Sequence, residues 1–208
     1  MRRAYYILVC AIVLIGCKKG KADFTIAGTL TDDTFGQGFS GATVSLYEVP
    51  AGGGTNNLVG QTTTGASGSY TFTFPRDQAE AYVLTTDKNN YFPLEETIYF
   101  SDLTIEEDNI RNFSTTAKAW VKLRFVNQAP ATATDLLRYL KQSGKVGCSE
   151  CHTTEEQFLS GIVDTVIQCA TDGNTTFSYF YDVIGASDQG IKSANAVAFD
   201  TTEILLNY

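Results

Sequence analysis

The sequence has few of the residue types on which most enzymes and nucleic-acid-binding proteins depend. It has one histidine, His152, so a metallopeptidase site with two histidine ligands is excluded. It has neither a Gly-x-Ser-x-Gly segment nor a phosphate-binding loop. Acidic residues outnumber basic ones, 23 against 15. This balance disfavours nucleic acid as a partner, because phosphate binding requires a basic surface. We therefore expect a protein that is not an enzyme.

The N-terminal segment holds the one long apolar run of the sequence. An uncharged stretch of about a dozen residues, 4–15, follows two arginines. This is shorter than the ~20 residues needed to span a bilayer and matches the apolar part of a secretion signal. The residues Leu14-Ile15-Gly16-Cys17 resemble the lipobox, the cleavage signal of bacterial lipoproteins. The resemblance implies a signal peptide over residues 1–16 and acyl chains, palmitate among them, on Cys17. An uncleaved anchor helix and an ordinary signal peptide are the alternatives.

The remainder of the chain consists of short segments in which polar and apolar residues alternate between turn residues. The clearest of them are Phe24–Leu30, Ala42–Glu48, Ser69–Phe74 and Ala119–Asn127. This pattern is typical of β-sandwiches. The spacing predicts six or seven strands between Asp23 and Thr116, followed by a second series. We therefore expect an all-β protein with two sandwiches in series, residues 23–115 and 118–208.

Several residues of the first series occur in a recognisable order. They are Phe24, Gly28, Gly41-Ala42-Thr43-Val44, Gly68-Ser69-Tyr70-Thr71-Phe72 and Asp87-Lys88-Asn89-Asn90-Tyr91-Phe92. This order resembles the carboxypeptidase regulatory-like, transthyretin-like domain, a small β-sandwich common on Bacteroidota lipoproteins. The resemblance covers about 90 residues and implies a fold rather than a chemistry, because the zinc-binding catalytic domain of that family is absent.

The tether, residues 17–22, is basic, whereas the rest of the exported chain is acidic. Cleavage removes two arginines and no acid, which leaves 13 basic and 23 acidic residues and a formal charge of −10. Lys18 replaces the Asp that retains lipoproteins at the inner membrane of enteric bacteria. The segment Lys18-Lys19-Gly20-Lys21 also lacks the acidic surface-export signal of Bacteroidota lipoproteins. The lipoprotein resemblance therefore implies the outer membrane, with the lipid bilayer as a partner and the periplasmic face favoured over the cell surface.

A stretch at about residues 133–160 departs from the strand pattern. Asp135–Lys141 has the composition of a short helix that ends near Gly144. Thr154-Glu155-Glu156-Gln157 is a capping-box pattern, which opens a second short helix that stops at Gly161. We expect a small helical insertion in the second sandwich.

Between these two expected helices lies Cys148-Ser149-Glu150-Cys151-His152, which has the spacing of covalent c-type haem attachment. In such a site two thiols bond the haem vinyl groups, and the imidazole binds the iron. Two features argue against a haem. A haem pocket is normally built from several helices, and the only methionine, Met1, leaves with the signal peptide, so it cannot supply a second axial ligand. A haem-carrying electron carrier is therefore the alternative reading.

The favoured reading of the cysteines is a disulfide. Export leaves Cys148, Cys151 and Cys169 in an oxidising compartment, where three thiols allow one intramolecular bond. A link from Cys148 or Cys151 to Cys169 closes a loop of roughly twenty residues and stabilises the fold by about 3 kcal/mol in the chain-entropy model. Cys151 is slightly favoured over Cys148 as the partner of Cys169. A zinc site that adds His152 and a thioredoxin-like redox pair are lesser alternatives.

The remaining candidate ligands are weak. Asp32-Asp33 and Glu106-Glu107-Asp108 could bind calcium, although solvated turns are the favoured interpretation. We therefore expect no metal, no cofactor and no catalytic residues. The function expected is that of a non-catalytic binding or structural module on the envelope, with an envelope protein or a glycan as its partner.

Overall fold

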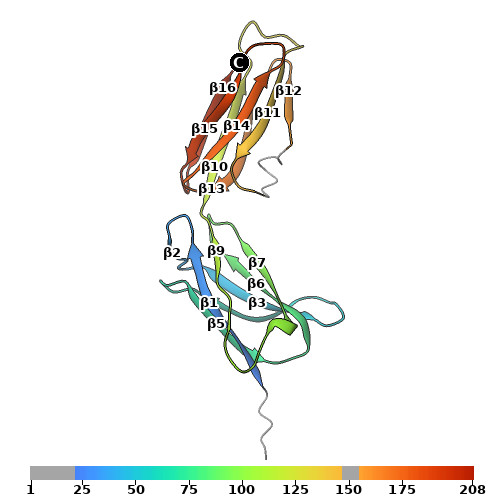
Figure 1. Ribbon diagram of the computed structural model, residues 1–208, viewed down its shortest axis with the longest axis vertical. Helices are drawn as coiled ribbons and strands as arrows, with labels where there is room; N and C mark the ends of the chain where they lie inside the picture. The colour runs from blue at the N-terminus through green and yellow to red at the C-terminus, as the bar shows by residue number, and fades with distance from the viewer. Residues whose placement is uncertain (1–21, 147–154) are drawn as a thin grey trace, which may run out of the picture.

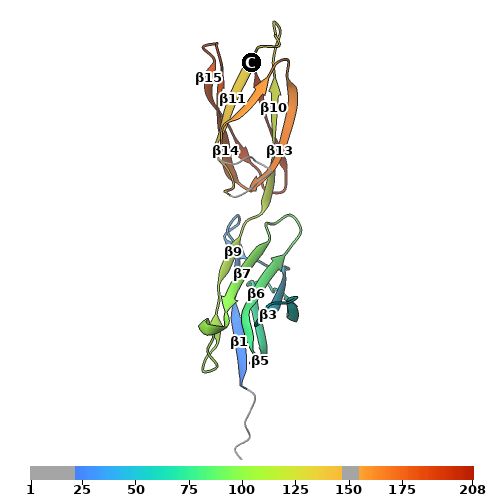
Figure 2. The same cartoon turned by 90° about the vertical axis from the view of Figure 1, so that its right-hand side faces the viewer.

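The computed structural model describes residues 22–146 and 155–208. Strands account for most of this part of the chain, and its one helical element is a single 3₁₀ turn, η1 (Phe100–Asp102). The all-β prediction is confirmed. The strands form two sandwiches stacked end to end along the long axis, as the two side views show (Figures 1 and 2). Across residues 22–146 and 155–208 we find no helix long and apolar enough to cross a membrane.

The first sandwich is built from two sheets. One contains β1 (Asp23–Asp32), β2 (Gln37–Gly38), β5 (Ser69–Pro75), β8 (Asn109–Ile110) and β9 (Phe113–Thr115). The other contains, in spatial order, β4 (Asn57–Thr63), β3 (Thr43–Pro50), β6 (Ala79–Asp87) and β7 (Leu94–Tyr99). The sequence spacing predicted fewer strands than these nine. The additional elements, β2, β8 and β9, are only two or three residues long, and an alternating pattern cannot be recognised over so few residues.

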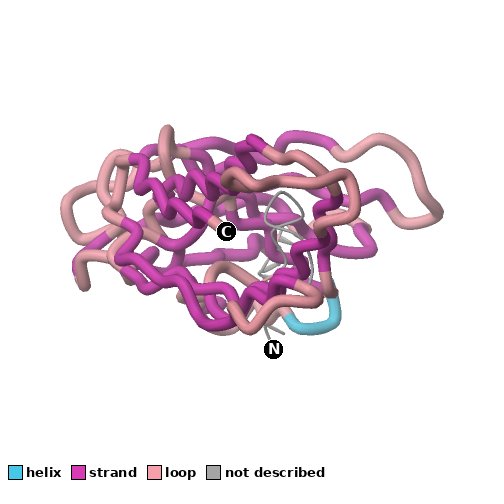
Figure 3. The backbone as a smooth tube through the Cα atoms, turned by 90° about the horizontal axis from the view of Figure 1, so that it is seen from above, coloured by secondary structure: helices cyan, strands magenta, loops and turns pink. Residues whose placement is uncertain are grey.

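The second sandwich repeats the two-sheet plan. One sheet has the order β13 (Asp164–Asp172), β10 (Lys118–Val126), β16 (Thr201–Asn207). The other has the order β12 (Gln157–Ser160), β11 (Leu136–Ser143), β14 (Thr175–Val183), β15 (Gln189–Ala196). Figure 3 looks down the long axis, with strands in magenta and η1 in cyan.

Each sandwich has its own hydrophobic core, produced by the alternation of side chains along the strands. In β5 the residues Tyr70, Phe72 and Phe74 are buried and their neighbours are exposed. In β10 every second residue, from Ala119 to Phe125, is buried in the same way. Ala117 packs in the first core and Ala119 in the second, so the change from one core to the other takes about two residues.

The expected helical insertion is wrong. Residues 136–143 form β11, which pairs with β14 from Leu137↔Val183 to Ser143↔Ser178. Leu137 and Tyr139 are two residues apart and both buried, the spacing of a strand. The segment also contains good helix formers, but pairing with β14 overrides that local preference. Residues 157–160 form β12 beside β11 rather than a helix. The capping threonine, Thr154, lies outside the described residues.

Candidate functional site

A pocket lined in part by the C-terminal residue, Tyr208, lies at the end of the second sandwich that is remote from the first, where Figure 1 marks the C-terminus. We call it the distal pocket; its volume is about 400 Å³. Three segments form it: the β10–β11 loop, the turn between β14 and β15, and Tyr208 after β16. The residues used below are Asn127, Pro130, Asp135, Val183, Ile184 and Tyr208. The Ala129–Pro130 peptide in this loop is cis.

Asp135 is the one charged side chain that lines the distal pocket. Its Oδ2 accepts hydrogen bonds from Asn127 Nδ2 and from the Thr132 backbone N, both at 2.9 Å. Its Oδ1 accepts one hydrogen bond, from Thr132 Oγ1 at 2.6 Å. The bonds from Thr132 and Asn127 hold the pKa of the Asp135 carboxyl below its usual value. The carboxylate is therefore charged at neutral pH.

Tyr208 contributes a hydroxyl group to the same end of the sandwich. Its Oη is buried and has no hydrogen-bond partner among the residues that the structure describes. Burial, and then the Asp135 charge, raise the pKa of Tyr208, so the phenol is neutral. The backbone of Tyr208 is fixed by bonds to Val126 O and from Gln128 N. A buried hydroxyl without a protein partner indicates a place where water or a ligand can supply one.

Apart from Asp135, the distal pocket has two polar amide side chains, Asn127 and Gln128, and a largely apolar wall, and no basic residue lines it. Pro130, Val183 and Ile184 line it together with two alanines, Ala129 and Ala186. Ile184 keeps 45% of its surface exposed although it is a large aliphatic residue. The pocket therefore combines one fixed negative charge with an apolar wall, an arrangement common to sites that bind small groups.

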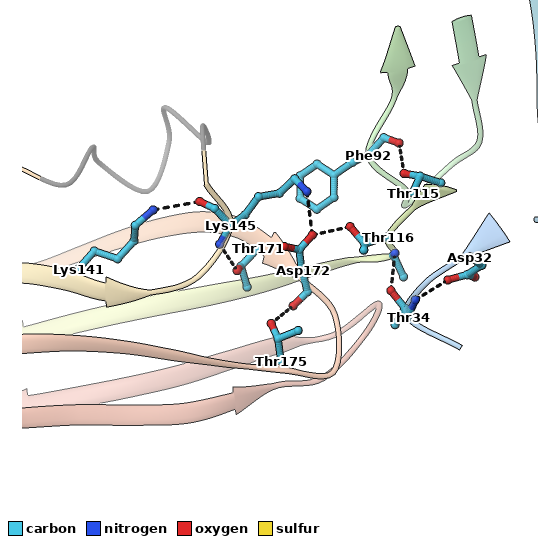
Figure 4. A network of polar contacts seen from close by, with 11 residues as sticks. Asp32, Thr34, Phe92, Thr115, Thr116, Lys141, Lys145, Thr171, Asp172 and Thr175 are labelled. Atoms are coloured by element: carbon cyan, nitrogen blue, oxygen red, sulfur yellow. Dashed lines mark hydrogen bonds and ion pairs between the residues drawn. The ribbon is translucent and has the colours of Figure 1, made fainter. Parts of the chain in front are cut away.

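A second hollow, of about 460 Å³, lies where the two sandwiches meet. Lys145, which follows β11, forms an ion pair with Asp172 at 2.8 Å and places its Nζ 4.1 Å from the centre of the Phe92 ring (Figure 4). Asp172 also accepts a hydrogen bond from Thr116 Oγ1, and the Ala117 backbone N donates to Thr34 Oγ1 (Figure 4). These polar groups are occupied with one another, so they join the sandwiches rather than present a site.

The cysteine and histidine positions singled out from the sequence are only partly described. Cys17, Cys148, Cys151 and His152 lie outside the described residues. Cys169 lies in β13, opposite Val121 of β10, and is 1% exposed within the second core. Cys169 is not a free side chain.

The two acidic segments considered as calcium ligands, Asp32-Asp33 and Glu106-Glu107-Asp108, have different environments. Asp32 is buried rather than solvated, which differs from the favoured interpretation. It accepts hydrogen bonds from Tyr91 Oη at 2.7 Å and from the backbone N of Thr34 and Phe35. The carboxylate therefore stabilises a turn. Residues 106–108 are exposed. Among residues 22–146 and 155–208, no group of three or more His, Cys, Asp or Glu side chains is placed to hold a metal ion.

The sequence did not indicate the distal pocket. Asp135 was expected to begin a helix, and Tyr208 was seen only as part of a final strand. One signal was present: Thr132 precedes Asp135 by three residues, and short side chains at that spacing often bond to the backbone of a turn. The positions of Val183 and Ile184 beside this turn follow only from the pairing of β11 with β14.

No family model matches the chain, and no curated protein matches its sequence. Among solved structures, the chain is similar to the TIE protein of Bacillus anthracis at 13% identity and a TM-score of 0.37, over 89% of this chain and 34% of that protein. It is also similar to the shaft pilin SpaA of Lactobacillus rhamnosus GG, at 12% and 0.34 over 89% and 96% of the two chains. A candidate carbohydrate-binding protein of Bacteroides uniformis gives 14% and 0.32 over 84% and 97%. The chain spans about a third of the TIE protein. At these TM-scores, no similarity carries an argument about function.

Proposed function

We propose that this protein is a non-catalytic envelope lipoprotein that presents the distal pocket away from the membrane. The observation that carries the proposal is the placement of the two ends. Strand β1 begins at one end of the long axis, and the C-terminal residue Tyr208, which lines the distal pocket, lies at the other (Figure 1). A lipid on Cys17 would therefore place the second sandwich farthest from the bilayer. Several acyl chains on one residue would make the anchoring stable.

The junction between the sandwiches supports this role as a spacer. Phe199, from the segment before β16, stacks on Phe35 with ring centres 5.8 Å apart and meets Tyr91 edge-on at 5.4 Å. The Lys145 contact with Phe92 is a second connection between the sandwiches. Contacts at two points resist bending better than a single linker does, so the chain should extend as one rod.

The type of the first sandwich and the location of the protein belong to the same proposal. The residue order over 24–92 supports a carboxypeptidase regulatory-like domain of a Bacteroidota lipoprotein. The basic tether supports the periplasmic face of the outer membrane. An envelope protein is the partner that we infer for the distal end.

We further propose that Cys169 forms a disulfide with Cys148 or Cys151, and that the Cys-x-x-Cys-His motif carries no haem. The burial of Cys169 in the second core, where its side chain is not free, supports a disulfide. Peptide mapping under non-reducing conditions tests the bond, and three alkylatable thiols would contradict it. A Soret band that survives acid–acetone extraction would show covalent haem instead.

Anchoring is tested by fractionating cells that produce either the wild-type chain or Cys17→Ser. We expect the wild type in the outer-membrane fraction and the variant in the soluble fraction, because the variant cannot be lipidated. A Cys17→Ser protein that still sediments with the outer membrane would contradict the lipid anchor.

Presentation of the distal end is tested by energy transfer in vesicles that contain acceptor-labelled lipid. A donor fluorophore at Asp23, beside the tether, should transfer strongly to the lipid, and one at the exposed Ser187 in the distal turn should transfer weakly. Equal transfer from the two positions would contradict an upright arrangement.

A further inference from the structure

We infer that the distal pocket binds the ammonium group of a lysine side chain from a partner protein. This inference rests on the proposed role of the distal end as the presented end of the molecule. The pocket is lined by the Asp135 carboxylate, by the amides of Asn127 and Gln128, and by an apolar wall that includes Pro130, Val183 and Ile184. A lysine side chain complements such a pocket, because its aliphatic stem can pack on the apolar wall while its charged tip meets the carboxylate.

The charge of the chain favours a cationic guest. The exported chain carries a formal charge of −10, and no basic residue lines the pocket to offset the Asp135 carboxylate. An anionic ligand would meet a like charge, and a neutral ligand would leave that charge without an opposite charge beside it. Charge complementarity of this kind selects partners and speeds their association.

The hydrogen bonds of Asp135 favour lysine over arginine. Oδ2 already accepts two bonds, from Asn127 and from the Thr132 backbone, whereas Oδ1 accepts only one. A guanidinium group binds best when both carboxylate oxygens are available for a bidentate pair. A compact ammonium group can bind at Oδ1 alone.

The test uses the isotope-labelled full chain in detergent micelles at low salt, with amide chemical shifts followed by NMR. The probe is acetyl-Ala-Lys-Ala-amide, and its uncharged counterpart has norleucine in place of lysine. We expect the lysine peptide to shift the amides of Gln128, Asp135 and Ala186, with an affinity at least about tenfold above that of the norleucine peptide. The arginine peptide should bind more weakly than the lysine peptide. Binding should also weaken with added salt.

Two variants and a matched control assign the binding to the pocket. Asp135→Asn should weaken binding of the lysine peptide by about fivefold or more, because it removes the charge and keeps one oxygen acceptor. Ala186→Trp, which fills the pocket and keeps the carboxylate, should weaken it as well. Asp188→Asn removes one charge from the same turn outside the pocket lining and should leave binding unchanged.

Several results would overturn the inference. They are equal binding of the norleucine peptide, tighter binding of the arginine peptide, undiminished binding by Asp135→Asn or Ala186→Trp, and no shift with any peptide. Free n-butylamine that binds as tightly as the lysine peptide would overturn the assignment to a protein side chain. None of these measurements depends on lipidation, so their failure is distinguishable from failure of the anchoring and energy-transfer tests.

Discussion

Buried tyrosine hydroxyls in the first sandwich differ in whether they have a partner. Tyr70 Oη donates to the Arg111 carbonyl oxygen at 2.7 Å. Tyr82 Oη is buried without a partner among the described residues, and burial raises its pKa to about 12. A satisfied buried hydroxyl contributes to stability, whereas an unsatisfied one carries a desolvation cost. The hydroxyls of Tyr70 and Tyr82 therefore have opposite effects on the stability of the same core.

This difference predicts opposite results for two equivalent substitutions. Tyr82→Phe should raise the free energy of unfolding by about 1 kcal/mol, because it removes a hydroxyl that costs desolvation. Tyr70→Phe should lower it by about 1 kcal/mol, because the Arg111 carbonyl loses its donor. Urea denaturation measures both. A loss of stability in Tyr82→Phe equal to that in Tyr70→Phe would show that Tyr82 Oη has a partner after all.

Asp135 gives the second residue-level prediction, a dependence of stability on pH. Its pKa is lower in the folded chain than its ordinary value of 3.8, because Thr132 and Asn127 donate to the carboxylate. A lowered folded-state pKa contributes stability above the unfolded-state pKa, and that stability is lost as pH falls through the folded-state pKa. Denaturation at stepped pH should therefore show a stability loss in acid that is smaller in Asp135→Ala. If the free energy of unfolding of Asp135→Ala fell in acid as steeply as that of the wild type, Asp135 would not be the source of this pH dependence.

Among the elements, β1 depends on close approach by the segment between β8 and β9. The Arg111 backbone N donates to Ala27 O at 2.8 Å, so this segment runs directly against β1. A Cβ atom at Gly28 would lie 1.7 Å from the Arg111 carbonyl oxygen. Only glycine fits at this position.

Gly28→Ala should therefore displace β8 and β9 and lower the free energy of unfolding by about 3 kcal/mol, in the range of other severe steric changes. The matched control is Gly65→Ala, where an added Cβ meets nothing within 4 Å and the backbone requires no positive φ. That control should be neutral or slightly stabilising, because alanine restricts the unfolded chain. Circular dichroism melts compare the two. Equal melting temperatures for Gly28→Ala and Gly65→Ala would contradict the close approach of Arg111 to Gly28.

For the whole molecule, the junction decides whether two sandwiches behave as one body. Phe199 has a φ of 67°, a left-handed conformation that is unfavourable for a bulky residue. Its aromatic contacts with Phe35 and Tyr91 offset that strain. Ala198 also packs against the first core, although it belongs to the second sandwich in sequence.

Phe199→Ala should therefore loosen the connection between the sandwiches. We expect calorimetric unfolding to change from one transition towards two, and a Phe199–Phe35 double-mutant cycle to give a coupling of about 1 kcal/mol. Leu205→Ala, at a residue that is 42% exposed in β16, is the control and should keep a single transition. A coupling energy of zero, with a single unfolding transition retained, would show that Lys145 and the backbone hydrogen bonds are enough to hold the two sandwiches together.

The sequence by itself determined the all-β class and the two series of strands. Alternation has a period of two, so residues such as Tyr70, Phe72 and Phe74 show their buried face without any knowledge of their neighbours. The composition also excluded a two-histidine metal site and disfavoured nucleic acid as a partner.

Only the tertiary structure decided the state of residues 136–143 and the position of the distal pocket. Leu136–Ser143 combines helix-forming residues with a short alternation, and pairing with β14 selected the strand because it buries Leu137 and Tyr139. The pocket joins the β10–β11 loop, the β14–β15 turn and Tyr208, which are far apart in sequence. Local patterns carry no information on such contacts, because strand register depends on which strands become neighbours. For that reason Asp135 could be read only as a helix start until its loop was placed beside Val183 and Tyr208.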